Sequence, residues 1–238
     1  MGKKIIVAGL GHGGIAAAAL IAKAGFDVTV YEKKSEGTLG YDWTDIFAPQ
    51  ALEIAGMSMP DEGKYEYKQD MTFFNPSFTK RLQQHVPEDK LEIKMERRDI
   101  YDHFINHALE CGVKIVYDCE VKAPIVLGNR VVGIKTEKGD IYGDLIIDSC
   151  GINSPVRSNL PDFFCIEKNV ERNEKISIYR AFFNIGSDEP AEAKFKVMLF
   201  PGGIQGVSWI ASEDDHTDLL IGRFEDFDIE EVEEAVEE

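Results

Sequence analysis

Short apolar runs separated by glycines open the chain. Lys3 to Ala8 is an apolar, β-branched run of the kind that forms a buried parallel strand. A cluster of glycines follows, and then the Ala-rich segment Ile15 to Ala24, which Gly25 closes in the manner of a helix C-cap. Asp27 to Glu32 is a second apolar run. This order predicts a β–α–β unit of the usual length, about thirty residues.

The pattern is less regular between residues 42 and 88, where aromatic residues and prolines are scattered without a long periodic run. This segment predicts short helices, loops and short strands. Farther along, apolar positions recur at helical spacing from Asp99 to Cys111, and Gly112 ends the predicted helix. The strands expected in this part of the chain are 65–68, 71–75, 91–95 and 113–117.

Strand-like patterning dominates the second half of the chain. Glu120 to Tyr142 predicts an antiparallel meander, Leu145 to Ile147 is one more apolar strand, and Ile176 to Phe224 is mostly strands. The turns expected between these strands are Gly128-Asn129, Lys138-Gly139-Asp140, Pro201-Gly202-Gly203 and Glu213-Asp214-Asp215.

Composition excludes several classes of function. The 238 residues carry a formal net charge of −17, so the surface repels nucleic acid and anionic lipid, and neither is expected as a partner. The apolar run Ile15 to Ala22 is too short to span a bilayer, so no membrane span is expected. The four cysteines form no CxxC pair, which favours reduced thiols and a cytoplasmic location. His103 and His107 share a helix face without a third ligand, so no metal site is expected.

The glycine cluster has the sequence Gly9-Leu10-Gly11-His12-Gly13-Gly14, a GxGxxG motif between a predicted strand and a predicted helix. In this motif Gly9 permits a tight turn, Gly11 lets a pyrophosphate approach the backbone, and Gly14 lets helix and strand pack closely. Glu32 ends the next strand, where a carboxylate holds the ribose hydroxyls and repels a 2′-phosphate. The motif predicts a dinucleotide at the helix N-terminus, and it serves NAD as well as FAD.

The segment Tyr142 to Arg157 carries a second pattern, a buried strand that runs into small polar residues. It resembles the second fingerprint of the geranylgeranyl reductase and p-hydroxybenzoate hydroxylase group of flavoproteins, in its D-x-x-G-x-x-S form. Cys150 stands where the commoner form of that fingerprint has Asp. The matching positions are Asp148, Gly151, Ser154 and Arg157. The resemblance implies FAD, and it counts against NAD.

Arg97 to Ala108 is similar to the R-x-x-(L/F)-x-x-x-L-x-x-x-A helix of the same group. The resemblance implies that Arg97 lies near the cofactor, where a cation pairs with pyrophosphate. A solvated Arg at the start of a helix is the alternative.

Phe200 to Ile210 resembles the aromatic-rich sheet that lines the lipid pocket of geranylgeranyl reductases. Ser208 and Trp209 match this pattern, whereas Ala211-Ser212 replaces the usual Phe-Pro. The alternative is a Trp in an ordinary antiparallel core.

The resemblance implies an α/β fold: a Rossmann-like FAD-binding domain, built on the β–α–β unit, with an inserted and mainly antiparallel β substrate domain. The expected segments are 1–41 and 91–160 for the FAD-binding domain, 42–90 and 161–225 for the substrate domain, and 226–238 for the acidic start of a truncated helix. The residues expected to bind the cofactor are Gly9, Gly11, His12, Gly13, Gly14, Glu32, Lys33, Arg97, Val121, Cys150, Gly151 and Ser154. No residue is identified as a catalytic acid or base.

The group's third fingerprint, usually G-D-A, does not follow Trp209. Asp228 and Glu231 form a potential capping box, yet no Gly, Asn or basic residue closes the helix they would begin. We therefore expect the chain to be a C-terminally incomplete part of a longer protein.

The expected function is an FAD-dependent oxidoreductase, of reductase or monooxygenase type. Its substrate would be a small organic molecule, such as a lipid or isoprenoid, with NAD(P)H or another compound as electron donor. Two alternatives stay open: a non-catalytic nucleotide-binding fragment or half of a split flavoprotein, and an NAD-dependent oxidoreductase.

Overall fold

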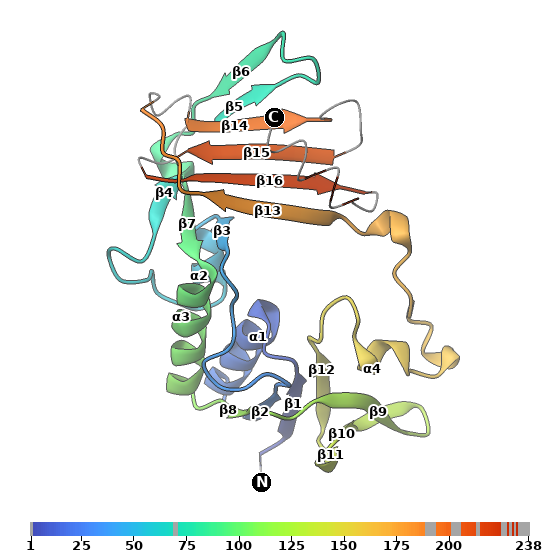
Figure 1. Ribbon diagram of the computed structural model, residues 1–238. Helices are drawn as coiled ribbons and strands as arrows, with labels where there is room; N and C mark the ends of the chain where they lie inside the picture. Colours follow the sequence, from blue (N-terminus) through green and yellow to red (C-terminus); the bar gives the residue numbers. More distant parts are fainter. Residues whose placement is uncertain are drawn as a thin grey trace. The chain divides into compact units, whose positions relative to one another are not determined.

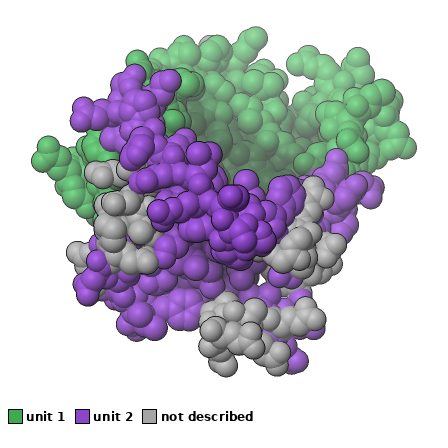
Figure 2. All heavy atoms as spheres, turned by 90° about the horizontal axis from the view of Figure 1, so that it is seen from above, with its two compact units in different colours: residues 1–67, 92–169 green, residues 68–91, 170–238 purple. Residues whose placement is uncertain are grey.

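The computed structural model describes residues 2–68, 71–188, 194–200, 206–212 and 215–224, together with Asp228, Glu230 and Val232. The chain divides into two compact units, shown in two colours in Figure 2. Unit 1 contains residues 1–67 and 92–169, and unit 2 contains residues 68–91 and 170–238. Each unit is therefore assembled from two separate stretches of sequence.

Unit 1 contains a parallel sheet, two small three-stranded sheets and four helices among its described residues (Figure 1). Its elements are β1 (Lys4–Ala8), α1 (His12–Lys23), β2 (Asp27–Tyr31), β3 (Thr44–Phe47), α2 (Gln50–Ile54), β4 (Glu66–Lys68, at the boundary with unit 2), β7 (Glu92–Glu96), α3 (Arg97–Glu110), β8 (Lys114–Val116), β9 (Val121–Leu127), β10 (Arg130–Thr136), β11 (Gly139–Tyr142), β12 (Leu145–Asp148), α4 (Pro155–Ser158) and a 3-10 turn, η2 (Asp162–Phe164).

The parallel sheet has the strand order β12–β1–β2–β8. Ile5 and Val7 of β1 pack in an apolar cluster with α1 and α3, which lie side by side (Figure 1). Ile6 and Ala8 belong to a second cluster, with residues of β9, β10 and α4. A strand that is buried on both faces needs a continuous apolar run, so the Lys3–Ala8 pattern is explained and the predicted β–α–β unit is confirmed.

The predicted meander is also confirmed, because β9, β10 and β11 form an antiparallel sheet in sequence order. The first turn lies at Gly128-Asn129 as expected, with Gly128 at φ +59°, and the second lies at 137–138, just before Gly139, which begins β11 at φ +124°. Such angles favour glycine, which explains why the sequence marks these turns clearly.

Residues 42–67 lie in unit 1, whereas the sequence assigned 42–90 to a substrate domain. The physical reason is long-range pairing: Phe47 of β3 lies opposite Ile93 of β7, and Leu52 packs in the same cluster as Ile93 and Met95. Residues 161–169 also lie in unit 1. The functional division into FAD-binding and substrate domains stays a prediction.

Unit 2 is built on one six-stranded sheet, in the order β13–β16–β15–β14–β5–β6 (Figure 1). All its neighbouring strands are antiparallel except β14 and β5. Its elements are β5 (Met71–Phe74), β6 (Arg81–Gln84), β13 (Ser177–Phe183), β14 (Phe195–Leu199), β15 (Gly206–Ser212), β16 (Thr217–Arg223) and the 3-10 turns η1 (Glu88–Lys90) and η3 (Arg172–Glu174). The expected turn at 201–203 and the residues Glu213-Asp214 lie outside the described residues.

A buried ion pair lies within the sheet of unit 2. Arg180 of β13 donates from Nε to Oδ1 of Asp218 at 2.8 Å, and only 2% and 4% of the two side chains are exposed. Trp209 lies near this pair, with its ring 5.2 Å from the Arg180 guanidinium and 5.4 Å from the Phe195 ring. These contacts place Trp209 on a packed antiparallel sheet, and its role in a lipid pocket stays a prediction.

The expected helix start at Asp228 is visible in part. The Asp228 carboxylate accepts the backbone N–H of Glu230 at 3.1 Å, and the Val232 N–H donates to the Asp228 carbonyl at 3.2 Å. Glu231 and residues 233–238 lie outside the described residues. None of the helices in the described part of the chain is long and apolar enough to cross a membrane.

Candidate functional site

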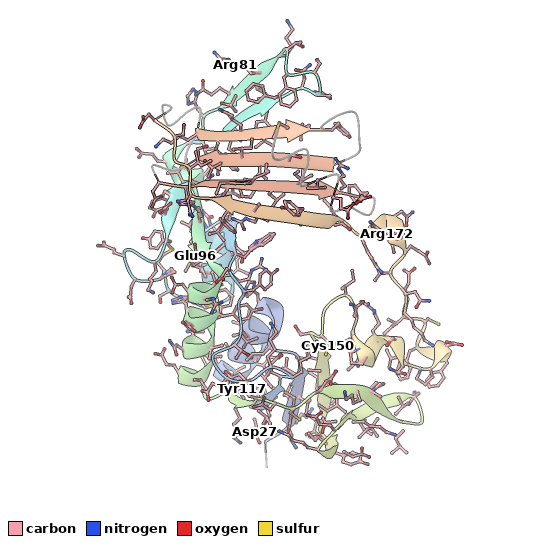
Figure 3. All side chains as sticks on the ribbon, viewed as in Figure 1. Asp27, Arg81, Glu96, Tyr117, Cys150 and Arg172 are labelled. Atoms are coloured by element: carbon pink, nitrogen blue, oxygen red, sulfur yellow. The ribbon has the colours of Figure 1, made fainter. Side chains whose placement is uncertain are left out.

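A cleft of about 540 Å³ opens in unit 1 at the carboxyl ends of β1, β2 and β12. In open parallel sheets this is the edge where ligands bind. Cys150, labelled in Figure 3, lies just after β12 on this edge. The lining residues are Gly9, Leu10, Gly11, Tyr31, Glu32, Lys33, Lys34, Leu39, Tyr101, Glu120, Val121, Ser149, Cys150, Gly151, Ile152, Asn153 and Pro155.

The glycine loop between β1 and α1 forms one wall of the cleft, and its glycines have different surroundings. Gly9 has φ +94°, and a Cβ there would lie 2.5 Å from the Ser149 carbonyl oxygen. A Cβ on Gly14 would lie 2.3 Å from the Gly9 carbonyl oxygen, so helix and strand pack as closely as expected. At Gly11, by contrast, the nearest atom to such a Cβ is 3.9 Å away. The protein itself therefore requires glycine at positions 9 and 14, and leaves space at Gly11.

The positive end of the α1 helix dipole lies at this loop. Gly11 is its N-cap, no side chain caps the first turn, and no acidic residue lies in that turn. The first N–H groups of a helix have no partner within the helix, and together with the dipole they attract an anion. This end of α1 is thus suited to phosphate.

Glu32 is 7% exposed and joins the two sides of the cleft. Its Oε2 accepts the backbone N–H of Leu10 at 2.8 Å, and its Oε1 accepts that of Lys34 at 2.9 Å. Each carboxylate oxygen has more than one lone pair, so both can still accept a ribose hydroxyl. Lys33 and Lys34 also line the cleft and place cations beside this carboxylate.

The second fingerprint forms a hydrogen-bonded turn after β12. Asp148 accepts the Ser154 hydroxyl through Oδ2 and the Cys150 N–H through Oδ1, the latter at 3.1 Å. The Ser154 oxygen in turn accepts the N–H groups of Val156 and Arg157, both at 3.1 Å, and so caps α4. Gly151 has φ +78° and lets the chain reverse beside the cleft. The Asp and Ser of this motif therefore shape the cleft wall from behind.

Two titratable groups that line the cleft, Cys150 and Tyr101, stay uncharged near neutral pH. Burial, helped by Asp148, raises the pKa of the Cys150 thiol to about 12. Burial also raises the pKa of Tyr101, whose phenol can therefore donate a hydrogen bond. These two groups offer neutral polar atoms, and Cys150 has none of the thiolate character that a redox cysteine needs.

Arg97 begins α3, directly after Glu96, which is labelled in Figure 3. Its guanidinium forms a bidentate ion pair with Asp45 of β3, with Nε 2.7 Å from Oδ2, and also contacts the Tyr41 hydroxyl. His12 lies nearby, and its ring centroid is 4.6 Å from that of Tyr101. Arg97 is therefore held by an anion of the chain itself, unlike a freely solvated Arg.

The structure gathers most of the expected cofactor residues at one place. Those that line the cleft are Gly9, Gly11, Glu32, Lys33, Val121, Cys150 and Gly151. His12, Gly13 and Gly14 begin α1 directly after the lining loop, Ser154 lies between the lining residues Asn153 and Pro155, and Arg97 is paired with Asp45 at the start of α3. Their contact with a cofactor stays a prediction.

Sequence reasoning missed several lining residues. Tyr101 follows Arg97 by one helical turn, and that spacing was a usable signal. Leu39 and Ile152 lie on irregular loops, where no periodicity marks them. Within the described residues, no group of three or more potential metal ligands is found.

Comparison with known proteins supports the resemblance. No family model matches the chain. A curated relative, the digeranylgeranylglycerophospholipid reductase of Haloferax volcanii, is 28% identical over 158 residues, which cover 66% of this chain and 37% of the relative.

Solved structures of similar fold extend over nearly the whole chain. A geranylgeranyl bacteriochlorophyll reductase-like protein of Thermoplasma acidophilum matches with a TM-score of 0.74 and 19% identity, covering 93% of this chain and 56% of its own. PqsL of Pseudomonas aeruginosa, in complex with 2-aminobenzoylacetate, matches with a TM-score of 0.72 and 16% identity, covering 98% and 62%. The myxobacterial FAD-dependent halogenase CndH matches with a TM-score of 0.70 and 17% identity, covering 93% and 52%.

These likenesses confirm the expected fold class and the resemblance to the geranylgeranyl reductase and monooxygenase group of flavoproteins. The chain spans 37% of the length of the curated relative and between half and two thirds of these solved structures.

Proposed function

We propose that the cleft of unit 1 binds the ADP part of FAD, and that the protein is an FAD-dependent oxidoreductase of reductase or monooxygenase type. One observation carries the proposal: the space beside Gly11 is free, at the uncapped N-terminus of α1 and on the same cleft as Glu32. A glycine at a position where the protein leaves room for a Cβ is explained by a ligand that approaches the backbone there.

The residues present fit this cofactor. The N-terminus of α1 would hold the pyrophosphate, Glu32 the ribose hydroxyls, and Val121 with Lys33 the adenine end of the cleft. FAD would supply the redox chemistry, while the protein supplies binding and orientation. The flavoprotein relatives favour FAD over NAD.

The substrate class is the finer part of the proposal. We infer a small organic substrate, such as a lipid or isoprenoid, because the curated relative is a digeranylgeranylglycerophospholipid reductase. NAD(P)H or another small molecule would supply electrons. We also infer a cytoplasmic protein, consistent with four free cysteines, and no nucleic-acid partner at a net charge of −17.

The test compares two glycine substitutions in one motif. Gly11→Val should leave folding intact, because the backbone at φ −76° and ψ 171° suits Val and its Cβ finds space. It should abolish FAD binding in a fluorescence titration, since the side chain fills the place of the pyrophosphate. Gly14→Ala should instead lower the melting temperature without ligand, because its Cβ meets the Gly9 carbonyl at 2.3 Å, an overpacking worth about 1–3 kcal/mol.

Equal FAD affinity for the native chain and a folded Gly11→Val variant would refute the assignment. Tight FAD binding without turnover of any isoprenoid or aromatic substrate would favour the alternative, a non-catalytic nucleotide-binding portion of a flavoprotein.

A further inference from the structure

A cluster of charged and aromatic side chains joins the segment after β2 to the N-termini of α1 and α3. Its members are His12, Tyr41, Trp43, Asp45 and Arg97. The Arg97 guanidinium lies 4.6 Å from the Tyr41 ring centroid and 5.2 Å from that of Trp43, and it is paired with Asp45. The cluster thus holds one Arg by three different side chains.

Backbone contacts fix the same segment on α3. The Arg97 N–H donates to the Trp43 carbonyl at 2.7 Å. Gly40 has φ +73°, and a Cβ there would lie 3.0 Å from Cα of Arg98. This close approach explains the glycine at position 40.

The cluster adjoins the cleft through two neighbours. His12 follows Gly11, which lines the cleft, and the ring of His12 packs against Tyr101, which also lines it. Nε2 of His12 is buried and has no hydrogen-bond partner among the described residues. A buried ring nitrogen without a partner costs free energy unless something else satisfies it.

The ion pair of Arg97 is well shielded, which gives it a defined geometry. The side chains of Arg97 and Asp45 are 18% and 24% exposed. A second pair at the same helix start, Arg98 with Asp42, is 58% and 88% exposed. Exposed ion pairs contribute little to stability, so Asp42 holds Arg98 in place less firmly than Asp45 holds Arg97.

We propose that Asp45 is a positioning residue: it holds the Arg97 guanidinium beside His12, so that a cation and an imidazole nitrogen stand next to the glycine loop where the nucleotide pyrophosphate binds. This inference rests on the proposed function for the identity of the ligand. That Arg97 lies near the cofactor is what the resemblance implies. The roles of Asp45, which holds Arg97, and of His12, which packs against Tyr101 of α3, are inferred from the geometry of this chain.

The electrostatics of His12 provide a readout inside the cluster. Burial lowers the pKa of His12, Asp45 opposes that change, and Arg97 adds to it. Removing the Asp45 charge while Arg97 remains should therefore lower the pKa of His12 further. This fall follows from the loss of the Asp45 charge itself and shows that Asp45 faces His12, whereas ADP affinity and its recovery in a charge-preserving variant test the positioning of Arg97.

The experiment uses Asp45→Asn, with Asp42→Asn as matched control. The control removes an acidic partner of the neighbouring Arg from the same segment. For each folded variant, the His12 pKa is measured by NMR without ligand, and the dissociation constants of ADP and FAD are measured by titration. Asp45→Asn should lower the His12 pKa and weaken ADP binding about tenfold, the effect of losing one charge-assisted contact. Asp42→Asn should change neither quantity.

Two further variants guard against a folding defect. Asp45→Glu keeps the charge and should recover most of the ADP affinity. Tyr41→Phe keeps the ion pair and removes only the phenol contact, so it should weaken ADP binding less than Asp45→Asn does. If Asp45→Asn does not fold, Arg97→Gln, which removes the positioned cation itself, takes its place, and an ADP affinity of that variant equal to that of the native chain would overturn the proposal.

If Asp45→Asn binds ADP as tightly as Asp42→Asn does, the proposal is wrong even though the nucleotide site stands. If the native chain binds neither ADP nor FAD, the proposed function fails, and the positioning role fails with it. The two failures are therefore distinguishable in one set of titrations.

Discussion

Cys150 shows how the environment of one residue decides its chemistry. Its place next to the cleft suggests a redox thiol, but a pKa of about 12 keeps it protonated at neutral pH. Cys165, by contrast, is exposed. In the native chain at pH 8, iodoacetamide should therefore modify Cys165 more than about a hundredfold faster than Cys150, because the thiolate is the reactive form.

Mass spectrometry of partially alkylated protein checks this expectation, and modification of both thiols after denaturation is the control. Comparable rates for Cys150 and Cys165 in the folded chain would contradict it.

Glu32 sets the expected preference among nucleotides. A 2′-phosphate placed about 4 Å from its carboxylate would meet a repulsion of about 4 kcal/mol at an effective dielectric constant of 20. Lys33 and Lys34 line the same cleft and reduce that repulsion. We expect ADP to bind at least about tenfold more tightly than its 2′-phosphorylated form. Glu32→Gln should reduce this difference in affinity between the two nucleotides. Calorimetric titration with both nucleotides measures it, and tighter binding of the phosphorylated form would exclude this role for Glu32.

At the level of residues, the sequence predicts what backbone geometry demands. A Cβ at Gly9 would lie 2.5 Å from the Ser149 carbonyl oxygen, and one at Gly14 would lie 2.3 Å from the Gly9 carbonyl oxygen, so both positions require glycine. The GxGxxG pattern indicates both. The pairing of Arg97 with Asp45 is not predictable in this way, because the two residues lie 52 positions apart and share no motif. Ser154 is found by its motif, yet only the structure shows that its hydroxyl joins Asp148 to the start of α4.

At the level of elements, the turn after β12 depends on Ser154. This residue is 2% exposed, and its oxygen accepts two backbone N–H groups at the start of α4. Ser154→Ala should lower the free energy of unfolding by about 1–2 kcal/mol, the usual cost of losing an N-cap, and it also removes the hydroxyl that donates to Oδ2 of Asp148. Ser158→Ala, in the exposed last position of α4, should change it by less than about 0.5 kcal/mol.

Urea denaturation of the two variants measures this difference. Equal unfolding midpoints for Ser154→Ala and Ser158→Ala would show that the cap contributes nothing to the fold.

Elements with a strong local signal are predicted well, and elements that depend on distant partners are not. Both faces of β1 are buried, so its apolar run is unmistakable. Every residue of β3 is only partly buried, and this strand exists because it pairs with β7, about fifty positions later. No local pattern of apolar residues carries that information.

At the scale of the whole molecule, pairing between distant parts of the sequence also explains why the two compact units differ from the segments expected from the sequence. Residues 42–67 lack periodicity, and this favoured a separate segment, but their apolar side chains complete a cluster with β7 and α3. The resemblance to flavoproteins identified the kind of fold correctly. Which residues join which unit follows from packing across long stretches of sequence, and motifs do not encode it.

The late position of β12 in the sequence also affects the way the protein is made. The Lys4 N–H donates to Asp144 across 140 positions of sequence, and one face of β1 and β2 is covered by residues of β9, β10 and α4. A ribosome that adds about 5–20 residues per second needs roughly 7–30 s to bridge that distance. During this interval the nascent β1–α1–β2 unit exposes Ile6, Ala8 and Tyr31 to the cell. We therefore expect the rate of synthesis to influence the yield of native protein.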